Sequence, residues 1–95
     1  MKDLLGRLSR DLNLRRSQVE RTVALFDEGN TLPFIARYRK EVTGGLDEVQ
    51  LAAFRDRLNE LRKLDERQKA VLKSIAEQGK LTPELEEAIE EAETL

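Results

Sequence analysis

Apolar residues recur along the chain at intervals of three and four positions, which is the spacing of one face of an α-helix. No stretch shows the sustained alternation of apolar and polar residues that is typical of a half-buried β-strand. The pattern therefore predicts an all-α fold of about five helices. Their expected positions are residues 2–12, 16–28, 33–41, 47–78 and a last helix that begins at residue 83.

Residues that favour helix ends stand between these segments. Ser17 lies three positions before Glu20, which is the spacing of a capping box and predicts a helix start at Ser17. Asp47 and Thr82 are the expected N-caps of the last two helices. The glycine pair at 44–45 predicts a turn between the third and fourth helices, because glycine adopts positive φ without steric cost.

The fourth helix is expected to be the longest, since no glycine or proline interrupts it before Gly79. A continuous helix over residues 47–78 would be ~46 Å long at a rise of 1.5 Å per residue. The polar gap at residues 65–68 is the alternative break point, but the absence of a helix breaker favours continuity.

The apolar stripe of this long helix offers a candidate protein interface, because a few short helices would leave part of it uncovered. Packing inside the chain is the competing interpretation. The candidate interface residues are Leu51, Leu58, Leu61, Leu72 and Ile75.

The amino-acid composition excludes several classes of function. The chain has 95 residues, enough for one small domain, and 38% of them are charged. It has no cysteine and no histidine, which removes thiolate chemistry, disulfides, the commonest metal ligand and the usual general base. We therefore expect no enzyme, no cofactor and no metal site. No apolar run approaches the ~20 residues that span a bilayer, so we expect a cytoplasmic protein without membrane contact.

The best candidate for chemistry is a cluster of cations around one aromatic ring, in a first half that carries more basic than acidic residues. Such a cluster can contact phosphates and stack on a base. The candidate nucleic-acid-binding residues are Arg37, Tyr38, Arg39 and Lys40, joined by Arg15 and Arg16 if these face the same way.

A structural interpretation competes with this one. Tyr38 can continue the apolar side formed by Phe34 and Ile35, and Arg37 and Lys40 can then pair with nearby carboxylates such as Glu41.

Residues 29–48, which read GNTLPFIARYRKEVTGGLDE, resemble the signature of the Tex family of bacterial transcription accessory proteins. The resemblance extends over essentially the whole chain, including residues 61–67 and 74–82. It implies that residues 1–95 are the helical, helix-turn-helix-like N-terminal domain of a longer protein. In that family a nuclease-like domain, helix-hairpin-helix elements and an S1 domain follow, and this sequence lacks them.

The resemblance implies a module that contributes to association with nucleic acid, DNA or RNA, or with the transcription complex. The alternative is a structural module whose long helix docks other domains of its parent or a protein partner. Apolar faces left without such domains also predict self-association of the isolated chain.

Overall fold

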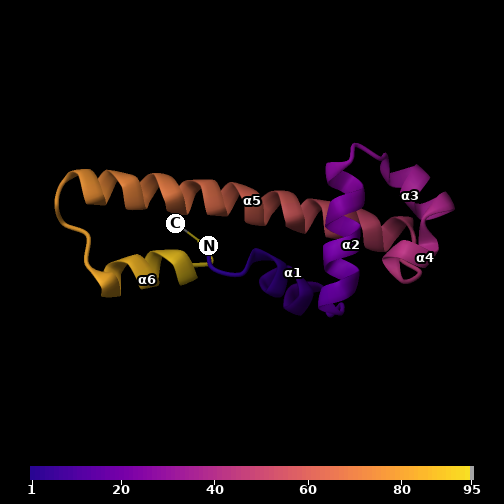
Figure 1. Cartoon of the computed structure of the whole chain (residues 1–95), viewed down its shortest axis with the longest axis horizontal. Helices are drawn as coiled ribbons and strands as arrows, with labels where there is room; N and C mark the ends of the chain where they lie inside the picture. The colour runs from indigo at the N-terminus through magenta and orange to yellow at the C-terminus, as the bar shows by residue number, and fades with distance from the viewer. Residues whose placement is uncertain (95) are drawn as a thin grey trace. The chain divides into compact units, whose positions relative to one another are not determined.

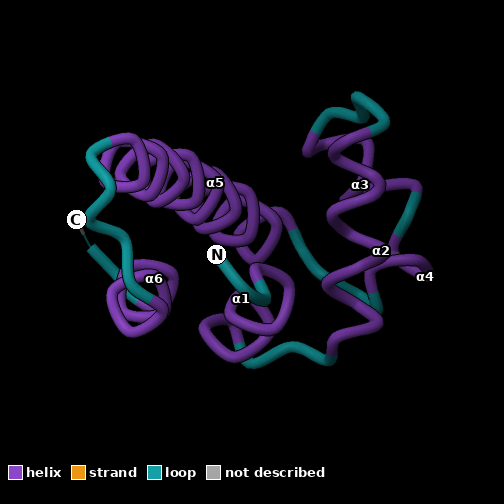
Figure 2. Tube along the Cα trace, turned by 60° about the vertical axis from the view of Figure 1, so that its left-hand side comes forward, coloured by secondary structure: helices purple, strands orange, loops and turns teal. Residues whose placement is uncertain are grey.

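The computed structural model describes residues 1–94, and the regular structure in this part of the chain is entirely helical (Figure 2). The all-α prediction is thus confirmed. The helices, labelled in Figure 1, are α1 (Leu4–Leu12), α2 (Arg16–Asp27), α3 (Leu32–Tyr38), α4 (Lys40–Thr43), α5 (Glu48–Glu77) and α6 (Pro83–Glu91). The long helix is confirmed as well, because α5 runs for 30 residues and passes through the polar gap without a break.

The segment predicted as one helix over residues 33–41 is two helices, which corrects the expected count. The break falls at Arg39, whose φ of −128° and ψ of 29° are not helical. Its N–H donates to Ile35 O and closes α3, and its carbonyl accepts from Thr43 N, which starts α4. Redirecting the chain here buries Thr43 beside α2, where Gln18 Nε2 donates to Thr43 O at 3.0 Å.

The caps at the ends of the helices were mostly predicted correctly. Asp47 Oδ1 accepts from Gln50 N at 2.8 Å and Asp47 N donates to Gln50 Oε1 at 3.1 Å, which together form a capping box at the start of α5. Thr82 Oγ1 accepts from Leu85 N at 3.2 Å at the start of α6.

The predicted start of the second helix at residue 16 is confirmed, but the capping box expected at Ser17 and Glu20 is wrong. The helix begins at Arg16, and the capping residue is Arg15, whose N–H donates to Gln18 Oε1 at 3.2 Å. A glutamine three residues after the cap thus fills the position that the sequence pattern gave to Glu20.

The chain divides into two compact units, of which one is Leu5–Asn59. Its core contains a cluster of five buried side chains: Leu25, Ile35, Ala36, Leu46 and Leu51. Phe54 is also fully buried, and its ring stacks on that of Phe26 with centroids 6.0 Å apart. Arg57 anchors α5 to α1 here, since its Nε and Nη2 lie 2.9 and 2.7 Å from Asp11 Oδ2.

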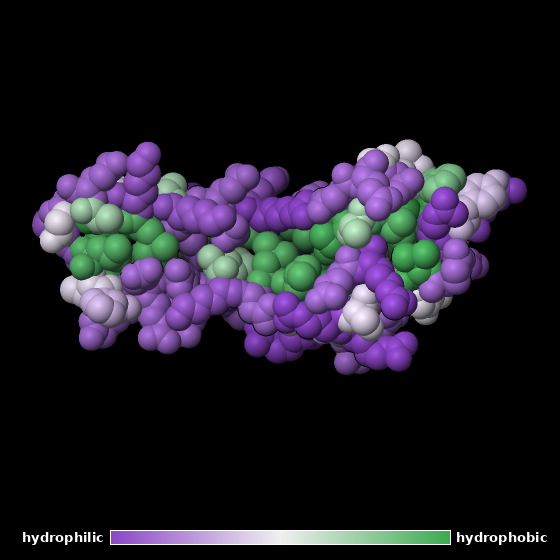
Figure 3. Space-filling view, viewed as in Figure 1, coloured by the Kyte–Doolittle hydropathy of each residue, from purple (hydrophilic) through white to green (hydrophobic). Residues whose placement is uncertain are grey.

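The other unit combines Met1–Leu4 with the chain from Glu60 onward. The α-amino group of Met1 donates to Asp65 Oδ1 at 2.8 Å. Gln68 is fully buried, and its Nε2 donates to Ala92 O at 2.8 Å. Apolar side chains gather between the C-terminal part of α5 and α6 on the left of Figure 3.

Burial divides the candidate interface residues of the long helix. Leu51, Leu58 and Leu61 are 0%, 2% and 1% exposed, so these three pack inside the chain and offer no surface to a partner. For them the competing interpretation holds. Leu72 and Ile75 are half-buried and remain candidates.

Candidate nucleic-acid interface

The short helix α3 is held by one buried face. Ile35 is fully buried and Ala36 is 5% exposed, and both belong to the core of the Leu5–Asn59 unit. Thr31 caps the helix through Oγ1, which accepts from Phe34 N at 3.4 Å, and Pro33 occupies the first turn. The remaining side chains of α3 are therefore displayed from a fixed backbone.

The outward face of α3 carries two aromatic rings, each with an arginine against it. The rings of Phe34 and Tyr38 are one helical turn apart, with centroids 5.2 Å apart and planes tilted by 48°. Arg37 Cζ lies 5.4 Å from the centroid of Tyr38, and Arg39 Cζ lies 5.1 Å from that of Phe34. Both distances are within the range of a cation–π contact. We call these four residues together with Lys40 the cationic–aromatic surface.

Exposure and pairing on this surface disagree with the structural interpretation of the sequence. Tyr38 is 53% exposed, so it does not continue the buried side that Ile35 occupies. Within residues 1–94, neither Arg37 nor Lys40 has a carboxylate oxygen within 4 Å. The expected pairing with Glu41 is therefore absent from this part of the chain, and the charges face solvent.

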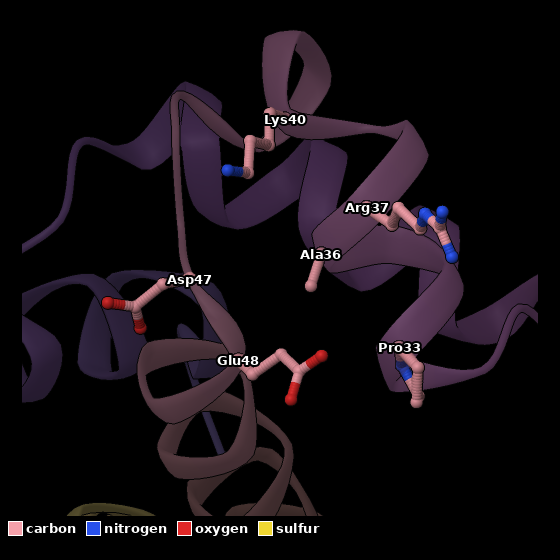
Figure 4. A pocket seen from close by; sticks show the side chains of 6 residues that line it. All are labelled: Pro33, Ala36, Arg37, Lys40, Asp47 and Glu48. Atoms are coloured by element: carbon pink, nitrogen blue, oxygen red, sulfur yellow. The ribbon is translucent and has the colours of Figure 1, made fainter.

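An open hollow of about 340 Å³ lies beside this surface, between α3, α4 and the start of α5 (Figure 4). Glu48 extends from the first turn of α5 toward α3, whereas the Asp47 carboxylate points away from α3 (Figure 4). The residues lining the hollow are Pro33, Ala36, Arg37, Lys40, Asp47 and Glu48.

The structure gathers some of the predicted residues and not others. Residues 37–40 lie together at the end of α3 and the start of α4, whereas Arg15 is the N-cap of α2 and Arg16 its first residue. Arg16 Nε instead lies 3.2 Å from Glu20 Oε1. Sequence reasoning missed Phe34 and Glu48 as members of the site. The spacing of four between Phe34 and Tyr38 was a usable signal, whereas Glu48 resembled an ordinary helix-start residue.

Residues 1–94 contain no group of three or more acidic side chains placed to hold a metal ion. None of the helices in the described part of the chain has the length and apolar character needed to cross a membrane.

Comparison with known proteins decides the family. Residues 2–76 match the sequence model of the Tex-like protein N-terminal domain. The chain belongs to this Tex family. It is 60% identical over 79 residues to protein YhgF of Escherichia coli (strain K12), covering 83% of the chain and 10% of that relative. It is 52% identical over 86 residues to transcriptional accessory protein Tex of Neisseria gonorrhoeae, covering 90% of the chain and 11% of the relative.

A more distant relative is human. S1 RNA-binding domain-containing protein 1 of Homo sapiens is 32% identical over 80 residues, which cover 84% of the chain and 8% of that protein. This Tex-family chain thus spans about a tenth of the length of the curated relatives that it matches.

Proposed function

We propose that the chain is a non-catalytic helical module of a transcription accessory protein, and that it contacts nucleic acid through the cationic–aromatic surface. One observation carries the proposal. An exposed tyrosine stands among three cations, of which Arg37 and Lys40 have no carboxylate partner within residues 1–94. Phosphates attract such cations and a base can stack on such a ring.

The names of two relatives support the proposal without locating the contact. One is called a transcriptional accessory protein, and another is named for an RNA-binding domain. The net charge of the whole chain is −2, so attraction to a polyanion has to come from a local cluster of cations.

Fluorescence anisotropy of the chain with labelled single-stranded RNA and duplex DNA tests the proposal. If the chain contacts three phosphates of a single strand, the logarithm of the binding constant should fall with the logarithm of the salt concentration with a slope near −2. The affinity should therefore drop about a hundredfold between 20 and 200 mM salt. The double variant Arg37→Ala, Arg39→Ala should bind more weakly with an unchanged helical circular dichroism signal.

The control is Arg21→Ala with Arg55→Ala, two exposed arginines outside the surface, because it removes the same charge. An equal loss of affinity in both double variants would show that net charge alone is responsible and would reject the site. Unchanged binding by the Arg37, Arg39 variant would reject it as well.

A second candidate function is protein docking through the C-terminal part of the long helix. Leu85 is 37% exposed, and Leu72 and Ile75 are half-buried, so this unit displays apolar surface. Other domains of a longer parent, or a second copy of the chain, would cover it. Sedimentation velocity should then show association that rises with protein concentration and resists added salt, since apolar contacts are not screened. A monomer at every concentration would count against this function.

A further inference from the structure

Glu48 is an unusual neighbour for a phosphate-binding surface. Its carboxylate extends toward α3 in a hollow that Arg37 and Lys40 also line (Figure 4). Yet within the described residues Glu48 has no cation within 4 Å. Because a carboxylate repels phosphate, the hollow is suited to a group that donates hydrogen bonds and not to a backbone phosphate.

The exposed ring of Tyr38 indicates that the ligand also contains an unpaired base. Tyr38 is 53% exposed, and Arg37 Cζ lies 5.4 Å from the centroid of its ring. Both a tyrosine ring and an arginine plane are platforms on which unpaired bases stack, whereas bases inside a duplex already stack on their neighbours. A ligand that uses both features therefore has a single-stranded segment.

The four bases differ in the hydrogen-bond donors on their Watson–Crick edges, and this difference determines which base fits a carboxylate. A carboxylate accepts two parallel hydrogen bonds through its two oxygens. Guanine offers two adjacent donors, N1–H and N2–H, on its Watson–Crick edge. Adenine and cytosine place an acceptor nitrogen next to their amino group, and uracil has one N–H between two carbonyls. Guanine is thus the base that matches Glu48.

We propose that the hollow between α3, α4 and the start of α5 holds an unpaired guanine read by Glu48, and that a neighbouring base of the same strand stacks on Tyr38. Arg37 lines the hollow and also contacts the Tyr38 ring, which places the two positions next to each other. This inference rests on the proposed function, because it assigns a ligand to the same surface. It adds single-strand selectivity and a base preference, which phosphate contact alone does not produce.

The test uses the full chain and fluorescein-labelled RNA 10-mers. One is all uridine, the second has one central guanosine, and the third has inosine at that position, which lacks the N2 amino group. We expect the guanosine strand to bind about tenfold tighter than the uridine strand. The inosine strand should fall between them. Annealing the guanosine strand to its complement should weaken binding.

Glu48→Gln should abolish the difference between the guanosine, inosine and uridine strands. Glu41→Gln is the matched control, because it removes an exposed carboxylate from α4 that does not line the hollow. Both variants gain the same charge, so a general electrostatic effect raises their affinity for all three strands equally.

The outcomes separate this inference from the proposed function. If the chain binds RNA through Arg37 and Arg39 but shows no guanosine preference, or keeps that preference in Glu48→Gln, the inference is overturned and the proposed function stands. Equal affinity for the guanosine strand and its duplex overturns the single-strand selectivity. An absence of binding to every strand overturns both.

Discussion

The turn after α4 allows a sharp test of how the Leu5–Asn59 unit is held together. Gly44 and Gly45 are adjacent and both have positive φ, 78° and 91°. A Cβ at Gly45 would meet no atom within 4 Å, whereas a Cβ at Gly44 would lie 2.3 Å from Gln18 Nε2. Alanine at the two sites thus imposes a similar backbone strain but a different collision.

The magnitudes follow from those contacts. Left-handed backbone costs a non-glycine residue about 1–2 kcal/mol, offset in part by the lower entropy of the unfolded alanine chain, so Gly45→Ala should cost about 1 kcal/mol. Gly44→Ala also displaces the Gln18 side chain. Gln18 then loses its hydrogen bond to Thr43 O and the one it accepts from Arg15 N. At about 1 kcal/mol each, these losses bring the cost of Gly44→Ala to about 3 kcal/mol.

Urea unfolding followed by circular dichroism at 222 nm measures both variants, with equal m-values as the check that the same surface unfolds. Gln18→Ala completes a double-mutant cycle. In that background the collision is gone, so Gly44→Ala should cost only about 1 kcal/mol. Equal costs for the two glycine variants, or strict additivity in the cycle, would refute the assignment of Gln18 as the side chain that joins α2 to α4.

Three further predictions concern stability. The hydrogen bond from the Met1 ammonium holds the pKa of Asp65 below its usual value. The ionised Asp65 therefore contributes its full stabilisation above about pH 4, and this contribution disappears as the pH falls through the lowered pKa. Asp65→Asn should flatten the pH dependence of the free energy of unfolding, measured in urea, in that acid range. Asp47→Ala removes the cap on Gln50 N and should cost about 1 kcal/mol in urea unfolding, a value that Asp47→Asn should largely restore. Phe54→Ala should cost about 3–5 kcal/mol, seen as a large fall in thermal midpoint, because the ring is fully buried.

Helix caps and long uninterrupted helices were predictable because their signals are local. Asp47 and Thr82 each satisfy a backbone N–H three residues further along, and this needs no knowledge of the rest of the fold. The break at Arg39 was not predictable in this way. No glycine or proline marks it, and its geometry is stabilised by Gln18, which lies 25 positions from its acceptor Thr43.

The candidate site also depends on tertiary contacts that local sequence signals do not predict. Phe34, Ile35 and Tyr38 all fit one broad apolar side of a helix, and only the tertiary partner decides which of them is buried. The core takes Ile35 and leaves Tyr38 at the surface. The polar gap of the long helix does not interrupt it, as the absence of a helix breaker predicted. Gln68 stands seven residues after Leu61, on the same face, and is buried because its amide donates to Ala92 O.

The arrangement of α3 separates the buried residues that hold the helix in place from the exposed residues of the cationic–aromatic surface. Ile35 and Ala36 fix the helix from inside, so the positions of Arg37 and Tyr38 do not depend on their own interactions. Fixed positions lower the entropy lost on binding. At physiological ionic strength charges act over about 8 Å, so under the proposed function this local arrangement, and not the net charge of −2, determines the attraction to nucleic acid. A chain that is acidic overall can therefore present a phosphate-binding surface, provided that its cations are held together and left unpaired by the fold.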